Sequence, residues 1–101
     1  ELMLMDEPLS ALDALLREDL QDMLLELWRT RGYAQVLVTH SIEEAVFLGR
    51  RIVVLSPRPG RVATIIDNPG MGALDYRGAE AFHLVSQRVR AALQEGVAVC
   101  A

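Results

Sequence analysis

The sequence contains no lysine: all ten of its basic residues are arginines. A phosphate-binding loop of the GxxxxGK[ST] type needs a lysine that reaches the phosphates of a bound nucleotide. No such loop is therefore present in these 101 residues, and every mechanism that requires a lysine from this chain is excluded.

Cysteine and long apolar runs are scarce as well. Cys100 is the single cysteine, so an internal disulfide is impossible, which suits a reducing compartment. No apolar run approaches the roughly 20 residues of a membrane span, and no signal peptide is visible. The net charge is −4 and the arginines are spread along the chain. This argues against a nucleic-acid-binding surface, in which basic residues cluster.

The length is enough for one small domain, and the hydrophobic fraction of 51% supports a core. The first residue is Glu1 rather than methionine, and a hydrophobic segment follows it directly. Because a natural domain rarely begins in this way, we expect the chain to be the C-terminal part of a longer protein.

The first half of the chain predicts a strand, a helix and a second strand. The apolar run Leu2–Met5 indicates a strand buried on both faces, as in a parallel sheet. The segment up to Gly32 predicts a helix, and Gln35–Thr39 predicts another buried strand. The apolar face expected for the helix is formed by Leu16, Leu20, Met23, Leu24 and Leu27.

The second half predicts a short helix, a hairpin and a final helix. Ser41 and Glu44 have the spacing of a capping box, in which each side chain accepts a hydrogen bond from the backbone amide of the other residue. Residues 51–55 and 61–67 predict two strands around a Pro-Gly turn. After a loop, residues 76–96 predict an amphipathic helix with Phe82, Val85, Val89 and Leu93 on one side.

This order of elements brings three chemically active side chains together. A strand, a helix and a strand of this length predict a right-handed parallel crossover. Asp6 and Glu7 follow the first strand, and His40 follows the second. Because parallel strands end at the same edge of a sheet, where open α/β folds bind ligands, we expect these side chains to converge there.

Two carboxylates and an imidazole at one edge suit the cleavage of a nucleoside triphosphate. One carboxylate can hold Mg²⁺ through water, and the other can accept a proton from an attacking water. The histidine can contact a phosphate oxygen or hold the water. Taken singly, the acidic pair is also a common signal for a turn and helix start, and a histidine at a strand end is more often structural.

The sequence resembles the C-terminal half of an ABC transporter ATPase. The segment "LMLMDEP" resembles a Walker B strand with its following glutamate, "SALD" resembles the D-loop, and "VLVTHS" resembles the switch-histidine loop. The segment "VVLSPRPGRV" is similar to the importer ATPases of the nitrate, sulfonate and taurine group. The resemblance implies a partial P-loop NTPase fold of class α/β, with a parallel sheet, flanking helices and the N-terminal half missing. Residues 1–101 would be one incomplete domain, with residues 1–67 running from Walker B to the hairpin.

The resemblance also implies a role for each matching residue. Asp6 would bind Mg²⁺ through water, Glu7 would be the general base, and His40 would contact the γ-phosphate of ATP. Ser10 and Asp13 would lie in the loop that crosses the interface between two ATPase subunits. The sequence departs from the family at Ser41, where aspartate is commoner, and both residue types cap helices.

The whole protein would then be an ATPase subunit that powers import of a small solute such as nitrate, sulfonate or taurine. It would lie peripherally on the cytoplasmic face of the inner (plasma) membrane, bound to permease subunits and served by a solute-binding protein. These 101 residues alone are expected to be inactive, because the phosphate loop and signature motif are not among them. Two alternatives keep the fold, namely a non-catalytic remnant or interaction module and an ABC-type DNA-maintenance ATPase.

Overall fold

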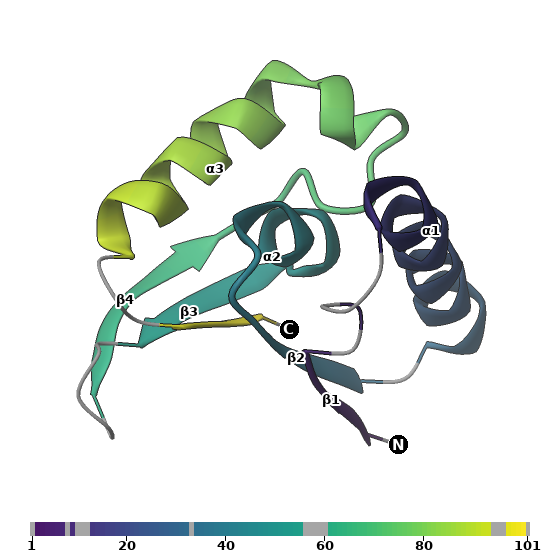
Figure 1. The fold of residues 1–101 in the computed structure, drawn as a ribbon, viewed down its shortest axis with the longest axis horizontal. Helices are drawn as coiled ribbons and strands as arrows, with labels where there is room; N and C mark the ends of the chain where they lie inside the picture. Colours follow the sequence, from purple (N-terminus) through teal and green to yellow (C-terminus); the bar gives the residue numbers. More distant parts are fainter. Residues whose placement is uncertain are drawn as a thin grey trace.

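The computed structural model describes residues 2–7, 9, 13–32, 34–55, 61–93 and 97–100. The chain forms a five-stranded sheet in the order β1-β2-β5-β3-β4, and Figure 1 shows its helices on one side of this sheet. The elements are β1 (Leu2–Asp6), α1 (Ala14–Arg31), β2 (Ala34–Thr39), α2 (Ile42–Leu48), β3 (Arg51–Leu55), β4 (Val62–Asp67), the 3₁₀ turn η1 (Tyr76–Gly78), α3 (Glu80–Ala92) and β5 (Val97–Cys100).

The strand pairing confirms the α/β class and the parallel crossover. β1 pairs with β2 in parallel, with Leu4 opposite Val36 and Asp6 opposite Val38. β3 and β4 form the expected antiparallel hairpin. The Pro-Gly turn predicted between them lies outside the described residues.

The strand β5 was not predicted from the sequence. It lies antiparallel between β2 and β3, which gives the sheet a mixed character. Its four residues are too short a run to be distinguished from a chain end by pattern. The facing edges of β2 and β3 carry backbone groups that need partners, and β5 supplies them.

The core lies between one face of the sheet and the helices. Leu37, Ile52 and Val54 are fully buried on the sheet side. Phe82, Val85 and Val89 of α3 pack against them, which confirms the face predicted for this helix. Every helix within the described ranges is too short or too polar to cross a membrane.

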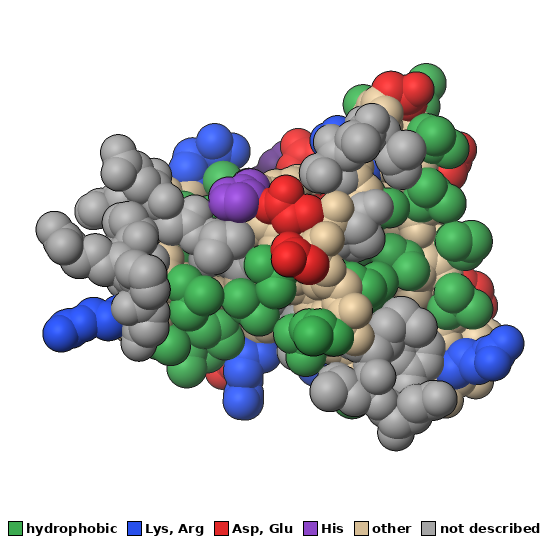
Figure 2. Space-filling view, turned by 60° about the horizontal axis from the view of Figure 1, so that its bottom comes forward, with side chains coloured by type: hydrophobic (Ala, Val, Ile, Leu, Met, Phe, Trp, Pro, Cys, Tyr) green, Lys and Arg blue, Asp and Glu red, His purple; other side chains and the backbone are tan. Residues whose placement is uncertain are grey.

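The opposite face of the sheet is open and apolar. Leu4 is 71% exposed and Ile65 is 56% exposed, while Val36, Val38 and Val53 are half-buried. Figure 2 shows hydrophobic side chains gathered on this face, with acidic side chains and a histidine at their border. The prediction that the first strand is buried on both faces was therefore wrong. β1 lies at an edge of the sheet, and the helices all lie on its other side.

The helix α1 also packs differently from its sequence pattern. Its C-terminal end is as expected, because Gly32 adopts the left-handed conformation that ends the helix, and its N-cap is Asp13, whose side chain accepts a hydrogen bond from the Leu16 amide at 3.0 Å. Its buried residues, however, are Gln21 and Leu25, whereas Met23 is 50% exposed. Gln21 lies in the stripe of α1 that faces the core, and its side chain hydrogen-bonds with the buried carboxyl group of Glu44.

The last helix is shorter than residues 76–96. Tyr76–Gly78 form the 3₁₀ turn, Ala79 is extended, and α3 runs from Glu80 to Ala92. The ring of Tyr76 is buried and its hydroxyl donates to Asn68 Oδ1, which fixes this turn apart from the helix. Residues 94–96 lie outside the described part of the chain.

Asn68 joins α2, β4 and the segment before α3. Its side chain is fully buried, and Nδ2 donates to the carbonyl oxygens of Val46 at 2.7 Å and Gly49 at 2.8 Å. Its Oδ1 accepts the Tyr76 hydroxyl. The end of α2 thereby has its carbonyls satisfied by a side chain from β4 rather than by water.

We expect Asn68→Ala to lower the free energy of unfolding by about 3 kcal/mol, because two carbonyls and one hydroxyl lose their buried partner. The matched control is Asp67→Ala, which removes only an exposed ion pair with Arg51. This control should change stability by less than about 0.5 kcal/mol. Urea unfolding of both variants measures the difference, and equal midpoints would contradict the role given to Asn68.

Candidate active site

The ends of β1 and β2 lie side by side, and this places the acidic pair beside the histidine. The pairing continues one residue beyond β1, since the Glu7 amide donates to the Val38 carbonyl at 2.7 Å. Glu7 has a φ of 49°, a left-handed conformation that is strained for a residue with a side chain. This turn ends the strand and separates the directions of Asp6 and Glu7.

Glu7 and His40 meet across the two strand ends. Glu7 Oε1 is in hydrogen-bond contact with His40 Nδ1. A carboxylate only accepts, so this contact places the proton on Nδ1. The side chain of His40 is 71% exposed and that of Glu7 is 31% exposed, so the pair borders solvent.

The predicted capping box is half right. Ser41 Oγ accepts the Glu44 amide at 3.2 Å and caps α2, as expected. The Ser41 amide, however, donates to Thr39 Oγ1 at 3.0 Å rather than to the Glu44 carboxylate. Glu44 instead turns into the protein, where its side chain is 2% exposed.

Glu44 is a buried carboxyl group that interacts with residues around the Glu7–His40 pair. Burial raises the pKa of the Glu44 carboxyl, while hydrogen bonds with Thr39 and Gln21 and the charge of Arg17 act in the opposite direction. The nearby charge of Glu7 adds to the rise in this pKa. The carboxyl group therefore lies among residues from β2, α1 and the end of β1.

Of the other two predicted binding residues, Ser10 and Asp13, the structure describes only Asp13. Asp13 is exposed and is the N-cap residue of α1. Ser10 lies outside the described residues. Leu9, which precedes Ser10 in the chain, is buried, and its carbonyl oxygen accepts a hydrogen bond from Arg17 Nε at 3.3 Å.

Asp6 suits a magnesium ion only in part. It is exposed at the end of β1 and offers one carboxylate. Among the described residues, no group of three or more His, Cys, Asp or Glu side chains is placed to hold a metal ion. Mg²⁺ commonly binds through one or two carboxylates, with water and substrate phosphates as its remaining ligands, so Asp6 fits that kind of site.

Sequence reasoning missed Glu44, Gln21 and Thr39 as members of this region. Gln21 and Thr39 are both 3% exposed, which is unusual for polar side chains. One signal was available in the sequence: Glu44 directly precedes the apolar residues 45–48, and these are buried in α2. A charged side chain beside buried apolar residues needs a local partner. The capping-box interpretation concealed this signal.

The chain is thus an α/β protein in which Glu7 and His40 meet at neighbouring ends of two parallel strands, with the helices on one side of the sheet. The comparisons with known proteins confirm the resemblance to ATP-binding subunits of importers. The chain is 55% identical over 62 residues to the taurine import ATP-binding protein TauB of Roseobacter denitrificans. It is 58% identical over 60 residues to the protein of the same name from Burkholderia pseudomallei.

A longer match extends this similarity. The chain is 49% identical over 87 residues, 79% of its length, to the taurine import ATP-binding protein TauB of Sinorhizobium fredii. The two shorter matches cover 61% and 59% of the chain. The matched segments amount to 23% to 33% of the length of these curated relatives. No family model matches the chain.

The contact between Glu7 and His40 predicts a measurable tautomer. We expect neutral His40 to carry its proton on Nδ1, because Glu7 accepts there, and Glu7→Ala to return it toward the commoner Nε2–H form. Nitrogen-15 chemical shifts of the imidazole distinguish the two forms. His83, exposed on α3, is the internal control and should not change. An Nε2–H form of His40 in the unsubstituted chain would contradict the contact.

Proposed function

We propose that this chain is part of an ATP-hydrolysing subunit of an ABC importer, with its hydrolytic groups at the ends of β1 and β2. The observation that carries the proposal is the contact of Glu7 with His40 at neighbouring ends of parallel strands. Similarity to importer ATP-binding proteins supports it and favours this reading over a DNA-maintenance ATPase.

In this proposal each residue has one role. Glu7 accepts a proton from the water that attacks the γ-phosphate. His40 is held by Glu7 through Nδ1, which leaves Nε2 of the neutral imidazole as an acceptor for a hydrogen bond from the attacking water. With both ring nitrogens protonated, Nε2 would instead donate to an oxygen of the γ-phosphate. Asp6 holds Mg²⁺ through water, and the ion when bound neutralises charge on the phosphates.

The remaining parts of the site come from elsewhere in the assembly. The phosphate-binding loop, with its lysine, is proposed to belong to the rest of the ATPase domain. Ser10 and Asp13 are proposed to face a second ATPase subunit. The subunit would lie on the cytoplasmic face of the membrane, attached to permease subunits. A solute-binding protein would deliver the solute to these permease subunits. Taurine is the solute that the names of the relatives favour.

The open face of the sheet is proposed to be covered by the rest of that domain. Parallel strands are normally covered on both faces, and here Leu4 of β1, which pairs in parallel with β2, is left exposed. Residues 1–101 would then be the C-terminal portion of a larger ATPase domain.

The first test is the substitution Glu7→Gln in the full-length protein. We expect ATP hydrolysis to fall by about 10²- to 10⁴-fold, because the general base is removed, while ATP still binds. Phosphate release and nucleotide binding measure the two effects. Glu43→Gln, an exposed neighbour of Glu44 on α2, is the control and should hydrolyse ATP normally. Normal hydrolysis by Glu7→Gln would mean that Glu7 is not the base.

The second test is His40→Ala in the same protein. We expect turnover to fall on the order of 10²-fold, because the hydrogen bond between His40 Nε2 and the reacting groups is lost. His83→Ala provides a matched control from the exposed side of α3. If the two alanine variants hydrolyse ATP equally well, His40 has a structural role only.

The third test uses the 101 residues alone. We expect no ATPase activity above background, because no lysine-bearing phosphate loop is present.

We also expect the 101 residues to self-associate through the open apolar face, and Leu4→Glu should reduce this association by placing a charge on that face. Analytical ultracentrifugation measures the association. Robust turnover, or a sharp reversible melt of a monomer at high temperature, would contradict this account.

A further inference from the structure

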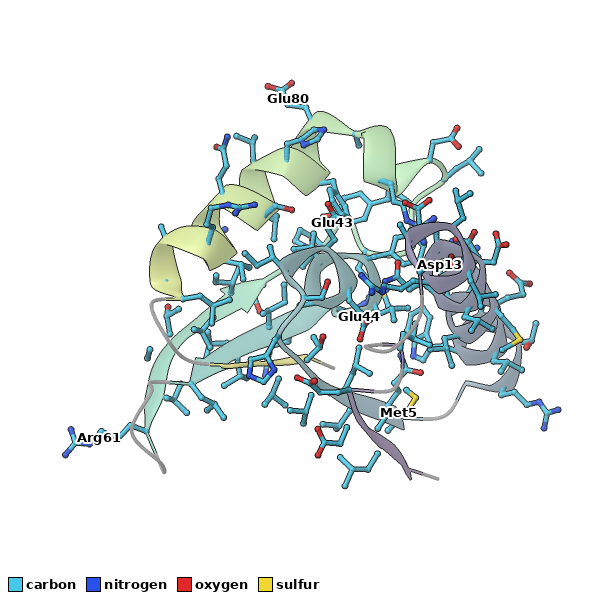
Figure 3. The ribbon with its side chains drawn as sticks, in the orientation of Figure 1. Met5, Asp13, Glu43, Glu44, Arg61 and Glu80 are labelled. Atoms are coloured by element: carbon cyan, nitrogen blue, oxygen red, sulfur yellow. The ribbon has the colours of Figure 1, made fainter. Side chains whose placement is uncertain are left out.

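Glu44 is a buried acid that the proposed reaction does not use. It lies in the first turn of α2, beside residues 45–48, which are all buried and apolar. Its neighbour Glu43 is exposed, and Figure 3 shows Glu44 between α2 and α1, above the strands. One of its oxygens, Oε1, has no hydrogen-bond partner among the described residues. A buried acid of this kind is costly, so its contacts are informative.

The first contact leads to the loop that carries His40. Glu44 hydrogen-bonds with the side chain of Thr39, the last residue of β2. Thr39 Oγ1 in turn accepts the Ser41 amide at 3.0 Å. Thr39 and Ser41 flank His40 on both sides, so their geometry sets where the imidazole stands.

The second contact leads to the loop that follows Glu7. Arg17 of α1 lies close enough for its charge to act on Glu44. The Nε of Arg17 donates to the carbonyl oxygen of Leu9 at 3.3 Å. Leu9 is buried, so this bond fixes the chain shortly after it leaves the strained turn at Glu7.

The third contact anchors the group to the rest of the fold. Glu44 hydrogen-bonds with Gln21, whose Oε1 accepts from Arg77 Nη2 at 3.0 Å. Arg77 also pairs with Asp22 of α1 at 2.9 Å. The network therefore extends from the two strand ends, through Glu44, to α1 and the segment before α3.

We propose that Glu44 is a positioning residue, which holds the His40 loop through Thr39 and the Glu7 loop through Arg17 so that the two side chains meet. This inference rests on the proposed function for its kinetic consequence and on the contacts above for its geometry. The hydrogen bonds of Glu44 reach His40 through the neighbouring residue Thr39, and the charges of Glu44 and Glu7 also act on each other directly.

The chemistry of a carboxylate suits this position. Glu44 only accepts when ionised, and both Thr39 and Gln21 can donate to it. In Glu44→Gln one oxygen can still accept from Thr39, so part of the arrangement survives. In Glu44→Ala both donors lose their acceptor, and Arg17 loses a nearby opposite charge.

The test uses the full-length protein with three substitutions: Glu44→Ala, Glu44→Gln and the control Glu43→Ala. We expect Glu44→Ala to lower kcat about tenfold or more, as loss of an orienting partner commonly does. The KM for ATP should stay within about twofold of the unsubstituted value, because Glu44 makes no contact with nucleotide in the proposed site. Glu44→Gln should recover much of the kcat, and Glu43→Ala should match the unsubstituted protein. An unchanged kcat in a folded Glu44→Ala variant overturns the proposal.

A second readout separates this proposal from the proposed function. Nitrogen-15 histidine shifts, with the His40 signal identified by its loss in His40→Ala, report whether the Nδ1–H form persists. We expect Glu44→Ala to shift His40 toward the Nε2–H form and Glu43→Ala to leave it unchanged. This readout needs no hydrolysis, so an inactive unsubstituted protein would contradict the proposed function alone. An unaltered His40 tautomer in folded Glu44→Ala would contradict the positioning role even if the protein hydrolyses ATP.

Discussion

The parallel pairing of β1 with β2 is the constraint on which the rest of the site depends. It sets Asp6 opposite Val38 and continues through the Glu7 amide to the Val38 carbonyl. Because both strands end at the same level, residues 33 positions apart in the chain come within hydrogen-bond contact. A shift of this register by one residue would turn Glu7 and His40 away from each other, since side chains alternate along a strand.

Two buried polar residues hold this pairing to the helices. Asn68 satisfies the carbonyls at the end of α2, and Glu44 connects the start of α2 with β2 and α1. The short helix α2 is thus fixed at both ends by side chains rather than by its own length, since seven residues form a marginal helix alone. The position of His40, which lies just before α2, depends on both anchors.

Much of this arrangement could be predicted from local pattern. The positions of β1–β4, the Ser41 cap, the Gly32 stop and the apolar face of α3 each depend on neighbouring residues, and each was confirmed. The failures concern packing between distant segments. On α1, Gln21 and Leu25 face the protein core, whereas Met23 is exposed. The Glu44 carboxylate turns inward to Thr39 and does not accept the hydrogen bond expected from the Ser41 amide. Residue types and spacing do not report which face of a helix meets a buried polar partner.

The sequence by itself determined which groups are available: an acidic pair after one strand, a histidine after the next, and no lysine. It also determined the crossover, because the handedness of strand–helix–strand units follows from backbone sterics. Only the tertiary structure decided that Glu7 rather than Asp6 contacts His40, that Glu44 is buried, and that one sheet face is left open. These outcomes depend on a single strained φ, on buried hydrogen bonds and on the layer of helices, which arise from contacts between segments far apart in the chain.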